Sequence, residues 1–362
     1  MSNFKFVLQV FLIWRLLLFT PLLFQQIPLN QFLIFPWTNF DGSHFISIAF
    51  NGYTFDGRFF PLYPILIKLG SLPFNFYEAY NFIDAYIYVG LFISNLFFLL
   101  SLMLLYKMVK NNYSEQIARL SVVSLLIFPT SFFFGGIYSE SLFLFLSLLT
   151  FYFSQKKQWG MASITALLLS VTRFVGIFIL LPLIYEFIVK EKANRLKSIS
   201  LFFIPSGLIA FSIFCYYKWG DALYFIKAQG QLGNSRSVDS IITPLQTVYR
   251  YLRILASLPY KQYDFWIALL ELSVFLFVSI LIYIGWKKKL NRSFFIFALI
   301  SFLIPVSSGT FTGLPRYVIT IFPLFITLAL INNRIFKFAY AIISTALLFV
   351  LLMLFSRGYF VA

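Results

Sequence analysis

Asp41 and His44 are the first residues in this chain whose types and spacing point to chemistry. They lie three positions apart in the stretch 37–53, which follows one long apolar run and precedes the next, and His44 is the only histidine. A positioned aspartate can act as a general base and take a proton from a sugar hydroxyl. Asp is also a common helix N-cap that accepts backbone N–H bonds from the first turn, where His44 would then pack. The local pattern leaves both interpretations of Asp41 open.

Glu140 and Arg173 are isolated charges at the ends of apolar runs. Charged side chains in membranes are costly and tend to mark functional sites, although an interfacial Glu140 in contact with water would leave the same pattern. Arg173 interrupts an apolar run from about 161 to 185, where it must find a carboxylate or a phosphate, or extend to the interface. A planar guanidinium offers several donors to a phosphate, which favours a phosphate ligand.

Two further arginines lie in or beside apolar segments. Arg316, in Gly313-Leu-Pro-Arg-Tyr-Val, begins a late apolar segment, and its position fits an interfacial anchor as well as a phosphate ligand. Arg15 lies about nine residues into the first apolar segment, roughly 14 Å deep at the rise of an α-helix. We expect Arg15 to pair with a carbonyl or an acid and to have a structural role.

The composition is that of a membrane protein. Hydrophobic residues make up 60% of the chain and charged residues 11%, whereas an ordinary soluble domain is about a quarter charged. The net charge of +16 is attributed to basic cytoplasmic loops, so no nucleic-acid partner is expected. The sequence has no Gly-rich phosphate loop and no His/Cys cluster, so no metal site is predicted. A divalent ion held by Asp41 and Glu140 is compatible with the chemistry but not required.

We predict an all-α polytopic protein with about eleven spans, because each span needs roughly 20 apolar residues. The whole chain, 1–362, is interpreted as one domain. The placement of Lys and Arg puts the N-terminus inside and the C-terminus outside. The expected helix breaks are at Arg173 and at 307–310. The spans are predicted near 6–28, 83–106, 117–134, 138–154, 160–172, 174–189, 199–217, 265–286, 294–306, 315–331 and 338–356.

Two outer loops, 29–82 and 218–264, are longer than turns, and most acidic residues lie on their side of the membrane. The first loop is expected to hold two amphipathic helices, one starting at Asp41 and one over 62–72. The polar interval 227–239 is expected to be a mobile loop. The chemistry is therefore predicted on the outer side.

The motif Asp-x-x-His-Phe-x-x-Ile-Ala-x-x-Gly-Tyr, followed by Phe-Phe-Pro-x-x-Pro, resembles the first lumenal loop of the GPI mannosyltransferase II (PIG-V-like) family. The segment from Pro129 to Phe143, with its Tyr-Ser-Glu, is similar to a second signature of that family, and Arg173 and Gly176 match a third. The resemblance covers about 14–176, with a weaker match at 313–323. Family members are polytopic GT-C-type glycosyltransferases that use lipid-phosphate sugar donors. The sequence departs from the family at Phe40, where Trp is frequent, and at Phe128, where Ser is usual.

The resemblance implies an inverting transferase that moves mannose, or a related hexose, from a polyprenyl-phosphate donor to a lipid-linked or cell-surface glycan acceptor. It implies no cofactor apart from that donor, and the plasma membrane of a prokaryote is favoured over the endoplasmic reticulum. Asp41 would be the catalytic base. The residues that the resemblance implies in substrate binding are His44, Tyr138, Glu140, Arg173 and Arg316. The alternative is a lipid or solute transporter, but the paired helix breaks usual in transporters are not evident.

Overall fold

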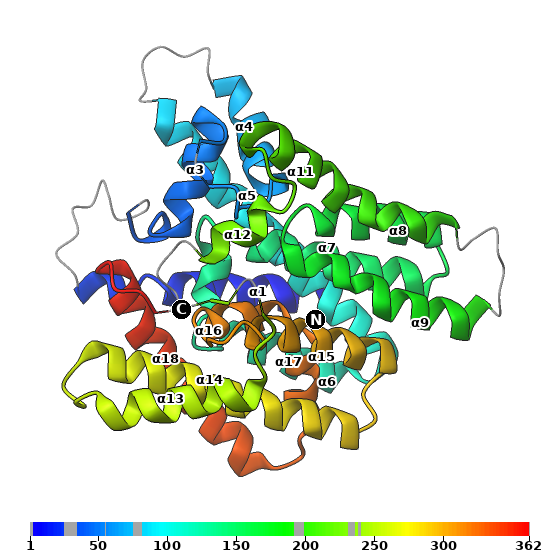
Figure 1. The fold of residues 1–362 in the computed structure, drawn as a ribbon. Coiled ribbons are helices and arrows are strands. Elements are labelled where there is room, and N and C mark those ends of the chain that lie inside the picture. Colours follow the sequence, from blue (N-terminus) through cyan, green and yellow to red (C-terminus); the bar gives the residue numbers. More distant parts are fainter. Residues whose placement is uncertain are drawn as a thin grey trace.

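The computed structural model describes residues 3–24, 35–54, 56–74, 82–191, 199–230, 236–237 and 240–361. These residues form helices, with no strand among them, as the all-α prediction requires (Figure 1). The α-helices are α1 (Asn3–Leu17), α3 (Asp41–Asn51), α4 (Leu62–Ser71), α5 (Phe82–Asn112), α6 (Glu115–Leu126), α7 (Glu140–Gln155), α8 (Trp159–Ser170), α9 (Leu180–Glu191), α11 (Ile204–Trp219), α12 (Tyr224–Gly230), α13 (Pro244–Ser257), α14 (Tyr263–Lys287), α15 (Arg292–Val306), α16 (Leu314–Tyr317), α17 (Pro323–Leu330) and α18 (Arg334–Ser356). The 3-10 turns are η1 (Pro21–Phe24), η2 (Phe35–Trp37), η3 (Leu72–Phe74), η4 (Ser131–Gly135), η5 (Phe174–Ile179), η6 (Ile199–Phe203) and η7 (Val318–Thr320).

Several helices are long and apolar enough to cross a membrane. Within the described part of the chain there are five of them: Phe4–Phe24, Ile83–Asn112, Ile199–Trp219, Tyr263–Lys287 and Arg334–Ser356. Other predicted spans correspond to shorter apolar helices, such as α8 and α15, so the total of eleven is not confirmed. The two predicted breaks are confirmed. Helix α8 ends before Arg173, whose backbone is extended, and α15 ends at Val306, before the turn at 307–310.

The two helices expected in the first outer loop are present as α3 and α4. Helix α3 buries Phe45, Ile48 and Ala49 on the predicted face and ends at Gly52, which has φ of 78°. Helix α4 begins at Leu62, as predicted, and buries Tyr63 and Ile67 at helical spacing. Both helices pack on α5, so they hold the N-terminus of α3 against the bundle.

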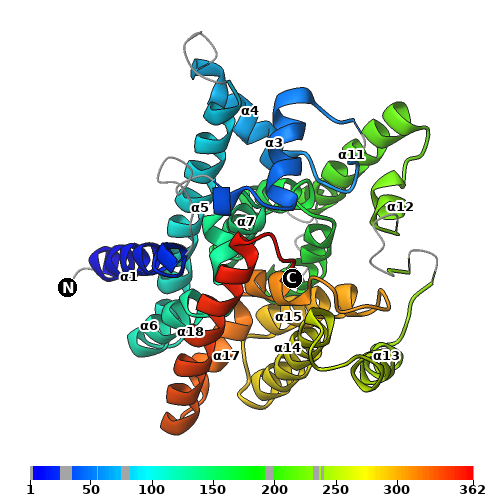
Figure 2. The same ribbon diagram turned by 90° about the vertical axis from the view of Figure 1, so that its left-hand side faces the viewer.

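Helix α7 forms the centre of the molecule. It is apolar and buried on most sides, which is the pattern of a helix enclosed by other elements. Figure 2 shows α7 in the middle of the ribbon, with α3 and α4 on one side and α14, α17 and α18 on the other. Its first residue is Glu140, which is 1% exposed. The central helix therefore carries a buried carboxylate at its N-terminus.

The predicted loop at 227–239 is partly helical. Helix α12 covers it as far as Gly230, and Arg236 and Ser237 are also described. Asp239 and the rest of that interval lie outside the described residues, as do 25–34 and 75–81 of the first outer loop.

Candidate active site

Asp41, Glu140, Arg173 and Arg316 all line one cavity of about 770 Å³. Asp41 comes from the start of α3, Glu140 from the start of α7, Arg173 from the break before η5 and Arg316 from α16. Apolar side chains of α12 and α15 line another part of the wall. Four charged residues that are far apart in the sequence therefore meet in one place.

Arg316 bridges the two carboxylates of this cavity. Its Nη1 lies 2.6 Å from Oδ2 of Asp41, and its Nε lies 3.3 Å from Oε1 of Glu140. The same Glu140 oxygen lies 2.5 Å from Nη1 of Arg173. The exposed fractions of these side chains are 27% for Asp41, 2% for Glu140, 18% for Arg173 and 10% for Arg316. The four form one largely buried ion network, in which removing a single partner would leave an uncompensated charge.

Asp41 is not the helix cap that its sequence context suggested. The N-cap position belongs to Phe40, no side chain caps the helix, and Asp41 is the first helical residue. Its carboxylate instead turns to Arg316, which donates to Oδ2. Burial alone would raise the pKa of Asp41, but the charge and the hydrogen bond of Arg316 outweigh it and hold that pKa below its ordinary value. Asp41 is therefore an ionised carboxylate at the wall of the cavity.

The segment 37–40 is fixed in place by long-range hydrogen bonds. Tyr138 donates its hydroxyl to the carbonyl of Asn39 at 2.7 Å, and the Asn39 amide donates to the carbonyl of Phe355 at 2.8 Å. These contacts hold Phe40 at φ of 53°, a conformation that costs a non-glycine residue about 1–3 kcal/mol. The residue after Asp41 is a glycine, Gly42, and this fits the tight packing, because a Cβ there would lie 3.3 Å from the carbonyl oxygen of Trp37. Asp41 thus directly follows a strained turn that long-range hydrogen bonds hold in place.

Tyr138 and His44 do not line the cavity. Tyr138 is buried beneath Arg316, whose guanidinium carbon lies 5.5 Å from the centre of its ring. His44 hydrogen-bonds through Nδ1 to Asp56 and stacks on Phe59. Arg58, which does line the cavity, donates from Nη2 to Nε2 of His44 at 3.4 Å, so Nδ1 carries the proton donated to Asp56. His44 is placed to act on the cavity through Arg58.

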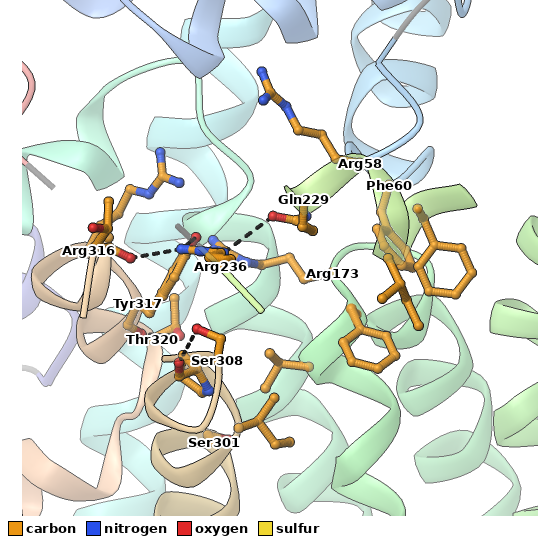
Figure 3. Close-up of a pocket in the computed structure, with 18 of the residues that line it drawn as sticks. Arg58, Phe60, Arg173, Gln229, Arg236, Ser301, Ser308, Arg316, Tyr317 and Thr320 are labelled. Carbon is orange, nitrogen blue, oxygen red and sulfur yellow. Dashed lines mark hydrogen bonds between the residues drawn. The ribbon is translucent and has the colours of Figure 1, made fainter. Parts of the chain in front are cut away.

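Tyr317 and Arg236 also line the cavity, although the sequence did not predict either of them as a site residue. The guanidinium carbons of Arg173, Arg236 and Arg316 lie 5.1, 5.3 and 5.4 Å from the centre of the Tyr317 ring (Figure 3). The only sequence signal for Tyr317 is its place beside Arg316. Arg236 lies in a polar loop without a motif, so its approach to the cavity depends on tertiary packing.

Arg15 was expected to pair with a carbonyl or an acid, but its Nη1 pairs with neither among the described residues. Its guanidinium carbon lies 4.3 Å from the centre of the Trp37 ring, and its Nη1 has no hydrogen-bond partner among the described residues. The cation therefore rests on an aromatic face behind the segment that carries Asp41.

Comparisons with known proteins find similarity to one protein family and to one solved protein. Residues 28–193, a little under half of the chain, match the family described as mannosyltransferase (PIG-V). No curated protein sequence matches the chain. The crystal structure of the Archaeoglobus fulgidus oligosaccharyltransferase in the apo form is similar with a TM-score of 0.51 at 14% identity, over 98% of this chain and 56% of that one. The complex of that oligosaccharyltransferase with Zn and sulfate gives a TM-score of 0.47 at 12% identity, over 90% and 48% of the two chains.

The fold is therefore similar to that of this oligosaccharyltransferase, in agreement with the GT-C-type fold that was predicted, and the chain spans little more than half the length of that protein. The match of residues 28–193 to the mannosyltransferase (PIG-V) family supports a glycosyltransferase. The matched region contains Asp41, Glu140 and Arg173, whereas Arg236 and Arg316 lie beyond it. The apolar helices and the family together support an integral membrane protein.

Proposed function

We propose that the protein transfers mannose, or a closely related hexose, from a polyprenyl-phosphate donor to a lipid-linked or cell-surface glycan acceptor. The reaction inverts the anomeric centre and takes place on the outer face of a prokaryotic plasma membrane. The observation that carries the proposal is the ion network in the cavity, where Asp41 and Arg316 are 2.6 Å apart. A base and a phosphate ligand side by side are what a glycosyl transfer of this kind requires.

The transfer is a single displacement. Asp41 accepts the proton of an acceptor hydroxyl, and the hydroxyl oxygen attacks the anomeric carbon from the side opposite the phosphate. The bond between that carbon and the phosphate oxygen breaks, and the phosphate leaves with the electron pair. Arg173 and Arg316 offset the charge that develops on the departing phosphate. Glu140 holds both guanidiniums in place and, as a residue of the cavity wall, is proposed to bind sugar hydroxyls.

No step of the proposed transfer involves a metal ion. Arg316 occupies the space between Asp41 and Glu140 that a divalent ion bound by both would take. A polyprenyl phosphate leaves from a single phosphate, whose charge arginines can neutralise. We therefore propose metal-independent transfer.

Replacement of Asp41 by Asn tests the assignment. Asn is close in shape to Asp but cannot take the proton, so transfer from a synthetic polyprenyl-phosphate mannose should fall by roughly 10²–10⁴-fold. Asp264→Asn is the matched control, because Asp264 is an exposed residue in the first turn of α14 that does not line the cavity. Turnover by Asp41→Asn close to that of Asp264→Asn, in protein with unchanged melting behaviour, would remove Asp41 from the base role.

A further inference from the structure

Four arginines line the main cavity, and their charges are compensated unequally. Those of Arg173 and Arg316 are balanced by Glu140 and Asp41 in the ion network. Arg58 lies 3.8 Å from a carboxylate oxygen of Asp56. Arg236 has no carboxylate within 4.0 Å in the part of the chain that the structure describes. Among the described residues, Arg236 is therefore the cavity arginine without a carboxylate in direct contact, although its charge also acts on the buried Glu271.

The hydrogen-bond partners of Arg236 among the described residues are neutral groups. Its Nη1 donates to Oε1 of Gln229 at 3.3 Å, and its Nη2 donates to the carbonyl of Thr312 at 2.7 Å and to the hydroxyl of Tyr317 at 2.8 Å (Figure 3). The buried Nε has no hydrogen-bond partner among the described residues. A buried cation held by neutral acceptors, with one donor unused, is an unfavourable arrangement until an anion binds.

The residue that follows Arg236 is hydrogen-bonded to the rest of the site. Ser237 donates its N–H to the carbonyl of Ser308 at 2.8 Å, in the turn that follows α15. Thr312, which accepts from Arg236, precedes Gly313, where φ of 81° allows the chain to turn into α16 and bring Arg316 and Tyr317 to the cavity. Arg236 is thus held in the same local framework as the residues of the ion network.

Part of the wall of the same cavity is apolar. Phe174, Val175 and Phe178 contribute from η5, and Leu303 and Ile304 contribute from α15. Both elements belong to short apolar helices that flank helix breaks. A ligand that contacts both Arg236 and this part of the wall would combine an anionic group with an apolar chain, which is the chemistry of a lipid phosphate.

We propose that Arg236 binds the phosphate of the polyprenyl-phosphate donor in the ground state, with the polyprenyl chain lying over the wall formed by η5 and α15. This inference rests on the proposed function. Arg236 binds the intact donor, whereas Arg173 and Arg316 act on the phosphate as it departs. The sugar is thereby directed toward Asp41 and Glu140. Loss of Arg236 should then affect donor binding more than the chemical step.

Binding of farnesyl phosphate, a sugar-free probe, tests this subsite without turnover. The readout is the rise in melting temperature of the purified protein with farnesyl phosphate, farnesol or inorganic phosphate. Wild type should respond best to farnesyl phosphate. Arg236→Gln should bind it about tenfold more weakly or worse, because a hydrogen bond to a charged group is lost, and Arg236→Lys should retain part of the affinity. Arg253→Gln is the matched control, since Arg253 is exposed on α13, away from the cavity.

Three results would overturn the inference. Equal affinity of wild type and Arg236→Gln would show that another group holds the phosphate. An equal response to farnesol would show that the phosphate is not recognised, and an equal response to inorganic phosphate would show that the lipid is not. KM for the mannosyl donor should rise in Arg236→Gln with kcat largely kept. A wild type that binds farnesyl phosphate through Arg236 but transfers no sugar would contradict only the proposed function.

Discussion

Arg316 has two opposing effects on Asp41. Its positive charge keeps the carboxylate ionised, which a general base requires, but the same charge lowers its affinity for a proton. The two effects are compatible if Arg316 pairs with Asp41 before the reaction and with the phosphate of the donor during it. When the phosphate attracts the guanidinium, Asp41 loses the positive charge that lowers its pKa, and its burial then raises that pKa. Asp41 therefore has a higher proton affinity at the step where the acceptor loses its proton.

The pH dependence of transfer should report this coupling. In the wild type, the pKa of Asp41 is below its ordinary value of about 3.9, so the acid limb of kcat/KM due to Asp41 should lie below that pH. Arg316→Gln removes the main charge that lowers the pKa and leaves the burial that raises it. The acid limb should therefore move to higher pH. The measurement is residual kcat/KM from about pH 4 to pH 8.

Arg316→Lys is the control for charge, and its acid limb should stay close to that of the wild type. The same pKa shift contributes to folding stability. Because the folded-state pKa is lowered, the contribution is present above the unfolded pKa of about 3.9 and is lost as pH falls through the folded value. An acid limb at the same pH in Arg316→Gln and Arg316→Lys would contradict the coupling.

The elements that carry the site differ in how far the sequence predicts them. The start of α4 and the break at Arg173 follow from prolines, apolar periodicity and an isolated charge, all of which are local signals. The sequence left a cap and a base as alternatives for Asp41, and the structure does not show the cap, because a tertiary partner, Arg316, takes the carboxylate that local hydrogen bonding would have used. Arg236 was not predicted as a site residue because its position depends on the turn after α15.

The turn before α3 should depend on Tyr138. Tyr138→Phe keeps the ring under Arg316 but removes the hydroxyl that holds the Asn39 carbonyl. The expected loss of stability is about 1 kcal/mol, as for one buried hydrogen bond. Because Phe40 is held in a strained conformation, the freed turn should also relax and move Asp41. Transfer kinetics should show a lower kcat, with a smaller change in KM for the donor.

Tyr63→Phe is the matched control for this prediction. The Tyr63 hydroxyl is also buried and lies 2.6 Å from the Ser94 hydroxyl, but it does not contact the segment before α3. A similar loss of stability without the loss of kcat is expected. If Tyr138→Phe reduced kcat no more than Tyr63→Phe, the turn would not depend on this hydroxyl.

At the scale of the whole molecule, the contacts place the predicted inner segments at one end of the protein and the cavity at the other. Predicted inner segments lie together, since the Asn291 N–H donates to the Tyr113 hydroxyl at 3.2 Å and Arg119 lies over the ring of Phe6. The C-terminal segment lies at the other end, where Phe360 lines the cavity and packs on Phe40. The active-site residues therefore share one end of the protein with the C-terminal segment, and the N-terminal segment lies with the basic loops.

This arrangement makes the topology a test of where the reaction takes place. Basic loops stay in the cytoplasm, so the end with the C-terminal segment and the cavity should face outward. Alkaline phosphatase, which is active only outside the cytoplasm, should be active when fused after Ala362 and inactive when fused after Lys289, in the basic segment before α15. A green fluorescent protein fused at the same positions should give the opposite pattern. Because Phe360 lines the cavity, a cytoplasmic C-terminus would place Asp41 on the cytoplasmic side and exclude an outward-facing donor site.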